Sequence, residues 1–171
     1  MWAIHGSRHI NPIMTKIITK RVEVHVFKKT KRGHKFLVLK RSPAGKYPNL
    51  WQMVSGTIEE GEKIYKTALR ELKEETQIEP EEMYIFPKIT EFYNFLDDDE
   101  ISFAPIFLVK AKTADVVISD EHSEYKWMDF HKAYKMAHWV QWKENIQHAE
   151  KILRNKILFK SLQKIELNKT I

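Results

Sequence analysis

The sequence predicts an α+β fold, with strands before and after one acid-rich helix and further helical sequence near the C-terminus. Three valines alternate with Glu and His in residues 21–27, a pattern typical of a strand. Residues 62–77 are rich in Glu, Lys, Ala and Leu and lack Gly and Pro, which favours a helix. Apolar residues recur at helical spacing over residues 140–164, so we expect a long amphipathic helix there.

The length and the first residues indicate one domain with a short extension. The chain has 171 residues, of which 43% are hydrophobic, and it can therefore bury a core without a second domain. Residues 1–15 show no clear periodicity and end beside a second methionine, Met14. We expect them to form an N-terminal extension, either disordered or an upstream start, before a single domain over residues 16–171.

The composition excludes several classes of protein. Without cysteine the chain forms neither disulfides nor thiolate metal sites, which excludes zinc fingers and thiol catalysis. No apolar run is long enough to span a bilayer and no signal-peptide core is present, so we expect a cytoplasmic protein without a membrane partner. The net charge is +6, but the lysines are spread from Lys16 to Lys169. An anionic small molecule fits this charge as well as nucleic acid does, and we do not expect a nucleic-acid partner.

Two basic residues end the second predicted strand. A turn over residues 28–34 joins strand 21–27 to a strand at residues 35–41 that is apolar on both faces until its basic end. Lys40 and Arg41 leave this strand on opposite sides, so one of them could bind a phosphate group of a substrate. Two exposed bases at a strand end are an equally good interpretation.

The segment between this strand and the acid-rich helix is predicted to be a loop, a short strand and a second loop. Residues 42–50 contain two prolines and a glycine, which are typical of a loop, and loops beside a site often contact substrate. Residues 51–55 form a short strand that leads into Gly56. The loop from Gly56 to Gly61 brings the backbone beside the helix, where a carbonyl at Gly56 could serve as an oxygen ligand of a metal.

Three carboxylates share one surface of the acid-rich helix, since Glu71, Glu74 and Glu75 fall within an arc of about 100°. The apolar stripe of the helix consists of Ile64, Tyr65, Ala68, Leu69 and Leu72. Glu71 and Glu75 project at the edge of that stripe, where like charges repel and a cation should hold them together. Arg70 can serve one carboxylate, and hard oxygen ligands suit Mg²⁺ or Mn²⁺. The alternative is a solvated, Glu-rich helix face.

Two long strands are expected after the helix. Pro80 marks the stop, and the segments Met83–Phe95 and Ile101–Lys112 are predicted to be strands joined by the acidic residues 97–100. The four consecutive acids lack the alternation and the glycine of a calcium loop. We therefore expect a solvated hairpin turn there.

The C-terminal part begins with an acid and a histidine. Glu121 lies in a predicted loop before a strand at residues 124–130, and a helix is expected to begin near His131. In the following helical region, we expect Trp139 and Trp142 to pack in the core rather than to form a platform that stacks on a base.

The residues from Gly56 to Ile78 resemble the signature of the Nudix hydrolases, which cleave nucleoside diphosphates linked to another group. Five residues separate Gly56 from Glu62, and seven more separate Glu62 from the sequence RELKEETQI at residues 70–78. One position differs, because Gln77 stands where the family usually has a helix-ending glycine. The texts WQMVSGTIEEGE and EHSEYKWMDF are similar to the branch that includes dihydroneopterin triphosphate pyrophosphatase, also described as a dATP pyrophosphohydrolase, whose members can lack that glycine.

This resemblance implies an α/β/α sandwich with a mixed sheet between helices, and a site for Mg²⁺ with Mn²⁺ as a substitute. It implies Glu71, Glu74 and Glu75 as metal ligands. The general base in this family can come from the helix, where Glu74 is the candidate, or from a loop, where Glu121 would be a further ligand or the base. Arg70 would orient a neighbouring carboxylate such as Glu71.

Three functions are compatible with these residues. The first is a pyrophosphohydrolase that cleaves a nucleoside or pterin triphosphate to the monophosphate and pyrophosphate, as a monomer or homodimer. The second is a dinucleoside polyphosphate hydrolase of the Ap4A type, for which Tyr93, 15 residues beyond Ile78, is a weak indication. The third is a Nudix module that senses a nucleotide without cleaving it; such modules usually lose signature acids, and this chain keeps all of them.

Overall fold

The computed structural model describes residues 17–44, 47–94 and 100–167. The expected extension at residues 1–15 and most of the acidic turn at residues 97–100 lie outside the described residues. None of the helices in the described part of the chain is long and apolar enough to cross a membrane.

The described residues form one mixed sheet of nine strands. The strands are β1 (Ile17–Ile18), β2 (Arg21–Thr30), β3 (Gly33–Arg41), β4 (Trp51–Gln52), β5 (Val54–Thr57), β6 (Pro80–Asn94), β7 (Glu100–Ala111), β8 (His122–Met128) and β9 (Lys164–Ile165). The main path runs β4-β3-β2-β7-β6-β9, while β1, β5 and β8 pair with β7, β2 and β3. The pairs β2–β7 and β1–β7 are parallel and the others are antiparallel.

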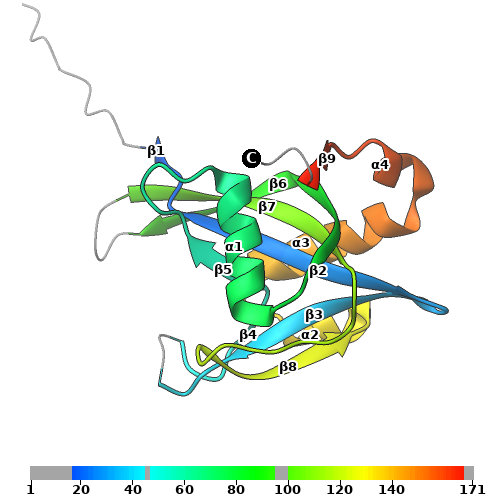
Figure 1. The fold of residues 1–171 in the computed structure, drawn as a ribbon, viewed down its shortest axis with the longest axis horizontal. Coiled ribbons are helices and arrows are strands. Elements are labelled where there is room, and N and C mark those ends of the chain that lie inside the picture. Colours follow the sequence, from blue (N-terminus) through cyan, green and yellow to red (C-terminus); the bar gives the residue numbers. More distant parts are fainter. Residues whose placement is uncertain (1–16, 45–46, 95–99, 168–171) are drawn as a thin grey trace, which may run out of the picture.

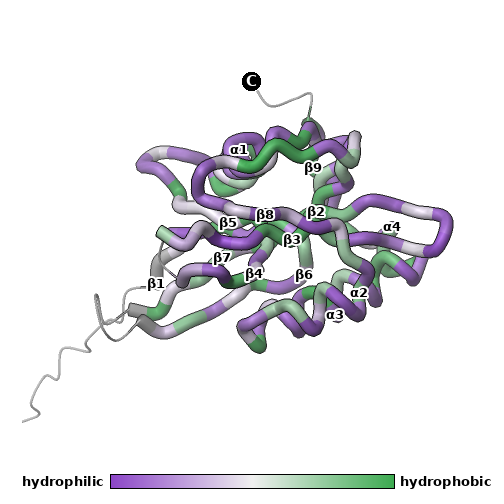
Figure 2. The backbone as a smooth tube through the Cα atoms, turned by 90° about the horizontal axis from the view of Figure 1, so that it is seen from below, coloured by the Kyte–Doolittle hydropathy of each residue, from purple (hydrophilic) through white to green (hydrophobic). Residues whose placement is uncertain are grey.

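Helices cover both faces of the sheet, which gives an α+β sandwich (Figure 1). The helices are α1 (Ile64–Thr76), α2 (Phe130–Met136), α3 (Val140–Arg154) and α4 (Lys156–Lys160). In the view turned by 90°, α1 lies on one side of the sheet and α2 and α3 lie on the other (Figure 2). Two buried clusters fill the space between these layers, one under α1 and one under α2 and α3.

Strand β2 shows how one sequence pattern serves both clusters. Its three valines are fully buried and pack in the cluster beneath α1. Because alternate residues of a strand point to opposite faces, Glu23 and His25 face α3, and both are buried as well. There the indole nitrogen of Trp142 donates a hydrogen bond of 3.1 Å to Glu23. The central position of β2 therefore buries both of its faces.

The helix predicted over residues 62–77 is shorter in the structure. Helix α1 begins at Ile64, since Gly61 has a φ of +77° and the Glu62 side chain folds back to accept hydrogen bonds from Thr67 and Arg70. Its apolar stripe packs against the sheet as expected. The segment predicted as one strand at residues 51–55 is divided into β4 and β5 at Met53.

The C-terminus of α1 forms a left-handed turn without a glycine. Gln77 adopts a φ of 56°, and its backbone N–H donates a 2.9 Å hydrogen bond to the carbonyl of Lys73. This is the geometry that glycine commonly supplies at a helix end. The substitution of Gln for Gly therefore keeps the turn, with a side chain in a conformation that costs free energy.

The prediction of one helix over residues 140–164 is wrong. Helix α3 ends at Arg154, and the side chain of Asn155 accepts hydrogen bonds from the backbone of Ile157 and Leu158, which starts the short helix α4. The chain then returns to the sheet as β9, which pairs with Met83 and Tyr84 of β6. Helical spacing continued past residue 154, but an asparagine that caps a new helix interrupts it.

Candidate active site

Helix α1 presents three carboxylates with very different exposure. The side chain of Glu74 is 58% exposed, that of Glu71 is 13% exposed and that of Glu75 is 4% exposed. The difference follows from the position of each residue relative to the apolar stripe that packs on the sheet. The three carboxylates therefore lie at different depths, from the solvent-exposed Glu74 to the buried Glu75.

Gly56 provides the space for the Glu71 side chain. The residue lies in β5, opposite Val22 of β2, on the face of the sheet that α1 covers. A Cβ atom added at position 56 would lie 1.7 Å from Cδ and 1.9 Å from Oε1 of Glu71. Only glycine lets the carboxylate lie this close to the β5 backbone.

Arg70 binds the carboxylates of Glu62, Glu71 and Glu74. Its Nε and Nη2 donate two 3.1 Å hydrogen bonds to Glu62, while Nη1 donates to Glu71 at 2.9 Å and to Glu74 at 3.0 Å. Nη2 also donates to the carbonyl oxygen of Thr57 at 2.9 Å. The expectation that Arg70 serves one carboxylate was therefore too narrow, since its planar fork of donors reaches three.

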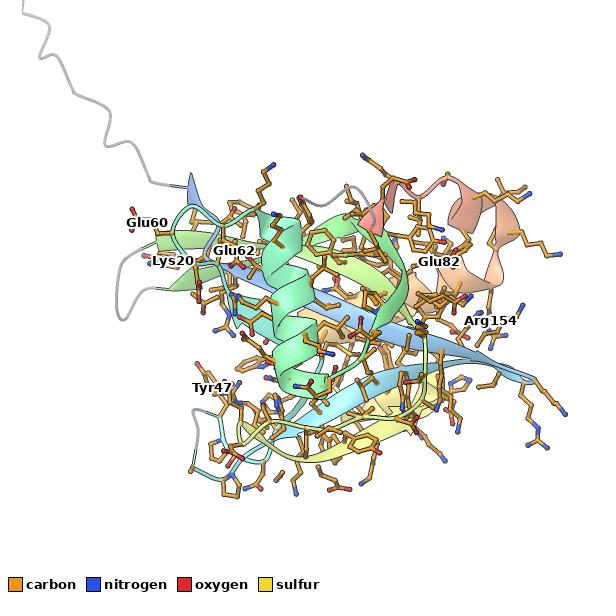
Figure 3. The ribbon with its side chains drawn as sticks, viewed as in Figure 1. Lys20, Tyr47, Glu60, Glu62, Glu82 and Arg154 are labelled. Atoms are coloured by element: carbon orange, nitrogen blue, oxygen red, sulfur yellow. The ribbon has the colours of Figure 1, made fainter. Side chains whose placement is uncertain are left out.

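The pair of Glu62 and Arg70 stays ionised over a wide range of pH. Hydrogen bonds from Arg70 and then from Thr67 lower the pKa of Glu62 to about 2, and the bond to Glu62 raises the pKa of Arg70. Figure 3 shows Glu62 near the N-terminal end of α1. This ion pair ties the loop before the helix to the middle of the helix.

Glu75 is a buried acid with one oxygen that lacks a protein partner. Its Oε2 makes no hydrogen bond in the described structure, and its pKa is raised well above the ordinary value by burial and by the charges of Glu71 and Glu121. A hydrogen bond from the backbone of Ser55 opposes that rise. Burial also raises the pKa of Glu71, against the effect of Arg70. A bound cation would relieve this repulsion.

The loop after β7 brings Glu121 to these acids. Two of its backbone N–H groups, from Val117 and Ser119, donate to the carbonyls of Thr76 and Glu75 at the C-terminal end of α1. These bonds satisfy carbonyls that a helix end leaves unpaired. Glu121 is exposed, and its charge raises the pKa of both Glu71 and Glu75.

The two basic residues at the end of β3 differ in their surroundings. Nη1 of Arg41 donates a 3.3 Å hydrogen bond to Oε1 of Gln52, and its charge acts on Glu75 and on His122. Lys40 lies in register with Trp51 of β4 and Glu124 of β8, and the described structure gives it no contact with the acids of α1.

Gln52 and His122 extend this polar group and were not predicted from the sequence. Both are buried, and their Nε2 atoms lie 3.4 Å apart, while Nε2 of His122 lies 3.9 Å from Oε2 of Glu75. Burial and then the charge of Arg41 lower the pKa of His122 to about 4. Two sequence features could have indicated them: Gln52 is a polar residue between the apolar Trp51 and Met53, and His122 follows Glu121.

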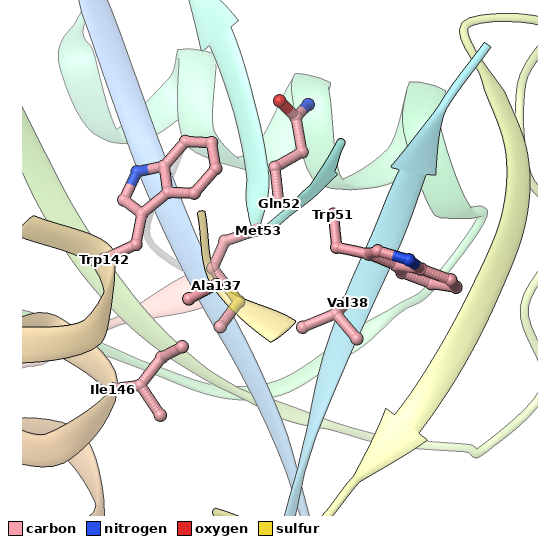
Figure 4. Close-up of a pocket in the computed structure, with 7 residues that line it drawn as sticks. All are labelled: Val38, Trp51, Gln52, Met53, Ala137, Trp142 and Ile146. Carbon is pink, nitrogen blue, oxygen red and sulfur yellow. The ribbon is translucent and has the colours of Figure 1, made fainter. Parts of the chain in front are cut away.

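The side of Gln52 away from α1 adjoins a small apolar hollow beneath α3. Its walls are formed by Val38, Trp51, Gln52, Met53, Ala137, Trp142 and Ile146. Figure 4 shows the Gln52 amide directed away from Val38, Ala137 and Ile146. The amide therefore belongs to the polar group under α1, and its aliphatic stem belongs to the wall of the hollow.

Three aromatic residues named in the sequence analysis have mixed surroundings. Trp139 is 39% exposed and lies edge-on to Tyr47 at 5.7 Å between ring centroids, so the prediction that it packs in the core is wrong. Trp142 is half-buried and packs against the cluster under α3. Tyr93 is 60% exposed on β6.

The acids of α1 fit a divalent cation. Glu75 offers a buried oxygen without a partner, and Glu71 sits on the backbone of Gly56 beside it. Carboxylate oxygens are the ligands that Mg²⁺ and Mn²⁺ prefer. Across residues 17–44, 47–94 and 100–167, no three acidic or imidazole groups already stand in a metal-ligand arrangement. Arg70 explains this for Glu71 and Glu74, because it draws both carboxylates to itself.

Comparison with known proteins identifies the family. The family described as NUDIX domain matches residues 19–149. The dihydroneopterin triphosphate diphosphatase of Haemophilus influenzae is 30% identical over 121 residues, which cover 63% of this chain and 73% of that protein. The asymmetrical bis(5'-nucleosyl)-tetraphosphatase of Rattus norvegicus is 29% identical over 105 residues, which cover 60% of this chain and 71% of that protein.

A solved structure supports the fold. The crystal structure of a protein described as a NUDIX hydrolase from Listeria monocytogenes superposes with a TM-score of 0.71 at 25% identity. The match covers 86% of this chain and 100% of that chain. The mixed sheet and the helices on both of its faces are therefore those of this fold.

Proposed function

Since the chain belongs to the Nudix family and is a hydrolase of phosphoric anhydride bonds, we propose that it cleaves a nucleoside or pterin triphosphate to the monophosphate and pyrophosphate in a metal-dependent reaction. The observation that carries this proposal is the buried Oε2 of Glu75, which has no hydrogen-bond partner among the described residues. Similarity to a dihydroneopterin triphosphate diphosphatase supports a substrate of this class.

The metal is Mg²⁺, with Mn²⁺ as a substitute. Glu71, Glu74 and Glu75 would hold it, with the backbone carbonyl of Gly56 as a further oxygen ligand. When bound, the metal neutralises the negative charge of the phosphate oxygens and makes hydroxide available near neutral pH. The raised pKa values of Glu71 and Glu75 support this assignment, because burial first, and then nearby carboxylates, disfavour their charged forms there unless a cation is bound.

Arg70, Glu74 and Glu121 complete the catalytic group. Arg70 keeps Glu71 and Glu74 within reach of each other through hydrogen bonds to both. Glu74 and Glu121 are the two candidates for the general base that takes a proton from the attacking water, and Glu121 can also act as a further metal ligand. Both are exposed, so a water can approach their carboxylates, and a general base must lie within hydrogen-bond reach of the proton that it takes.

Arg41 and Lys40 are the proposed contacts to substrate phosphates. Arg41 has the stronger support, because its charge acts on Glu75 and its guanidinium is held by Gln52. Arginine suits this task through its fixed fork of donors. Lys40, at the same strand end, is the weaker candidate of the two, since its strand neighbours are Trp51 and Glu124.

A product assay tests the proposal. Purified protein would be incubated with Mg²⁺ and dihydroneopterin triphosphate, each deoxynucleoside triphosphate, diadenosine tetraphosphate or ADP-ribose, and the products separated by ion-exchange chromatography. We expect pyrophosphate and the monophosphate from one or more triphosphates, and no turnover in excess EDTA. Turnover that persists in EDTA, or orthophosphate as the first product, would contradict the proposal.

A dinucleoside polyphosphate hydrolase is the second candidate. It is favoured by 29% identity over 105 residues to the asymmetrical bis(5'-nucleosyl)-tetraphosphatase of Rattus norvegicus and by the exposed side chain of Tyr93. ATP and AMP as products from diadenosine tetraphosphate, at a kcat/KM above that of every triphosphate, would select this activity. Tight binding of a nucleotide without turnover would instead select a sensing module, against which the retained acids of α1 argue.

A further inference from the structure

Four polar side chains lie in a row from the end of β3 to the buried acid of α1. Arg41 contacts Gln52, Gln52 contacts His122 and His122 lies beside Glu75, at 3.3, 3.4 and 3.9 Å between the atoms that face each other. Gln52, His122 and Glu75 are each at least nine-tenths buried. These buried polar groups are shielded from bulk water, so each depends on its neighbours for hydrogen bonds. Which atom donates and which accepts is therefore important.

Arg41 determines which end of the Gln52 amide faces the histidine. A guanidinium only donates hydrogen bonds, so the amide atom nearest to Nη1 of Arg41 must be the carbonyl oxygen Oε1. The amide nitrogen Nε2 of Gln52 then faces His122. With the amide reversed, two donors would face each other at Arg41.

The Gln52 amide in turn determines the tautomer of His122. The amide nitrogen is a donor, so the Nε2 atom of His122 must accept and its ring proton must be on Nδ1. The Nδ1 atom has no hydrogen-bond partner in the described structure. Nδ1 lacks a partner whichever ring nitrogen carries the proton, so it does not distinguish the tautomers. The contact of Nε2 with Gln52 therefore decides between them.

This tautomer has a consequence for Glu75. With its lone pair at Nε2, His122 cannot donate a hydrogen bond to Oε2 of Glu75, although the two atoms lie 3.9 Å apart. The described structure gives that oxygen no other donor. An imidazole N–H at this place would move a short distance and occupy the oxygen.

We propose that Gln52 is a positioning residue: held by Arg41, it fixes His122 in the Nδ1–H tautomer and so keeps Oε2 of Glu75 free to bind a divalent cation. The part of this inference that concerns the cation rests on the proposed function. The part that concerns the tautomer depends only on the contacts among the three side chains.

The tautomer can be measured without metal or substrate. The ¹⁵N chemical shifts of a histidine ring distinguish Nδ1–H from Nε2–H, and comparison with the His122→Phe variant assigns the His122 signal among the eight histidines of the chain. We expect Nδ1–H in the wild-type protein and Nε2–H in Gln52→Met, which keeps the length of the side chain but removes the amide. A wild-type Nε2–H tautomer would overturn the inference.

Mn²⁺ affinity, measured from the electron paramagnetic resonance signal of the free ion, tests the consequence for Glu75. We expect Gln52→Met to weaken Mn²⁺ binding by about 10- to 100-fold, the range typical of residues that orient metal ligands. In a His122→Phe background the same substitution should have no effect, because no imidazole remains to occupy Oε2. An equal loss in both backgrounds would mean that Gln52 acts only through packing, and an unchanged affinity would also refute the inference.

A control on the other face of the sheet accounts for general loss of stability. Thr90→Val removes the acceptor of a buried 3.0 Å hydrogen bond from Asn145, and it should leave both the tautomer and the Mn²⁺ affinity unchanged. The outcomes also separate the two proposals. An Nδ1–H tautomer in a protein that cleaves no triphosphate would refute only the proposed function, whereas active protein with Nε2–H would refute only this inference. If Gln52→Met does not fold, the wild-type tautomer alone decides.

Discussion

The carboxylate of Glu71 occupies the space that a side chain at position 56 would need. An added Cβ would lie 1.7 Å from Glu71 Cδ, far inside van der Waals contact. Both residues are held in place, because Gly56 is paired with Val22 in the sheet and the Glu71 carboxylate accepts a hydrogen bond from Arg70. The absence of a side chain at position 56 of β5 therefore leaves the space that the Glu71 carboxylate of α1 fills.

Replacing Gly56 by Ala should displace the Glu71 carboxylate. The added methyl group overlaps the side chain rather than the backbone, so we expect the fold to persist with a lower melting temperature. Mn²⁺ affinity should fall by about 10-fold or more, in the range found when a metal ligand loses its orientation. Calorimetric titration with Mn²⁺ and thermal unfolding would measure both effects. The neighbouring Thr57→Ala, whose side chain is exposed, should behave as wild type, and equal effects from both variants would contradict the role of Gly56.

Glu75→Gln should strongly reduce metal-dependent turnover while stabilising the metal-free protein. We expect kcat to fall by about 100-fold or more, beyond the range for residues that only orient ligands. Below the ordinary pKa of a glutamate both the folded and the unfolded chain are protonated, and the substitution should matter little. Because folding raises the pKa of Glu75, wild-type stability is lost as pH rises above that value.

Thermal unfolding in EDTA from pH 4 to 8 measures this difference. The melting temperature of Glu75→Gln should exceed that of wild type by an amount that grows with pH. Glu79→Gln removes an exposed acid bound to Lys73 and provides the matched control, without a gain in stability. A Glu75→Gln variant with wild-type turnover on its best substrate would show that the site is assigned to the wrong acids.

Arg70→Lys should show whether Arg70 acts through its positive charge or through the arrangement of its hydrogen-bond donors. Lysine keeps the positive charge but cannot make the paired hydrogen bonds to Glu62 while reaching Glu71 and Glu74. We expect kcat/KM to fall by about 10-fold or more, as for residues that orient metal ligands, with a lower melting temperature. Lys66→Arg, on the exposed side of α1, tests whether any Lys–Arg exchange on this helix has the same effect. Wild-type kinetics in Arg70→Lys would mean that a point charge is sufficient.

Gln77→Gly should stabilise the protein without altering catalysis. The left-handed conformation costs a residue with a side chain roughly 1–2 kcal/mol, and glycine adopts it freely. Greater entropy of the unfolded chain offsets part of this, by roughly 0.4–1 kcal/mol. We expect a net gain of roughly 0–1.6 kcal/mol in chemical denaturation, centred on about 0.8 kcal/mol. A loss of stability would mean that the Gln77 side chain makes a contribution larger than the strain, which Gln77→Ala would then reveal.

The sequence predicted the elements that carry local patterns. The alternating valines of β2 and the apolar stripe of α1 both pack as expected, because strand and helix periodicities directly report a buried face. The spacing from Gly56 to Glu75 was also readable from the sequence, since these residues lie within the end of one strand, one short loop and one helix. Glu71 and Glu75, which the sequence placed at the edge of this stripe, are both largely buried, while Glu74 is exposed.

Long-range contacts could not be predicted in the same way. Gln52 and His122 are 70 residues apart, and only the pairing of β3 with both β4 and β8 brings them together. The contact of Trp139 with Tyr47 likewise joins residues far apart in the sequence, because Tyr47 lies in the loop between β3 and β4. The end of α3 at Arg154 was not predicted, because apolar residues continue at helical spacing into α4.

The short strand β9 protects an edge of the sheet. Its two residues pair with Met83 and Tyr84 of β6, and Lys164 forms an ion pair with Glu82 beside them. Without β9 this edge would offer unpaired backbone groups to a second chain, which is a common route to aggregation. The tail that departs from the predicted helix thus bears on solubility, and a variant shortened before Lys164 should associate with itself at concentrations where the longer chain does not.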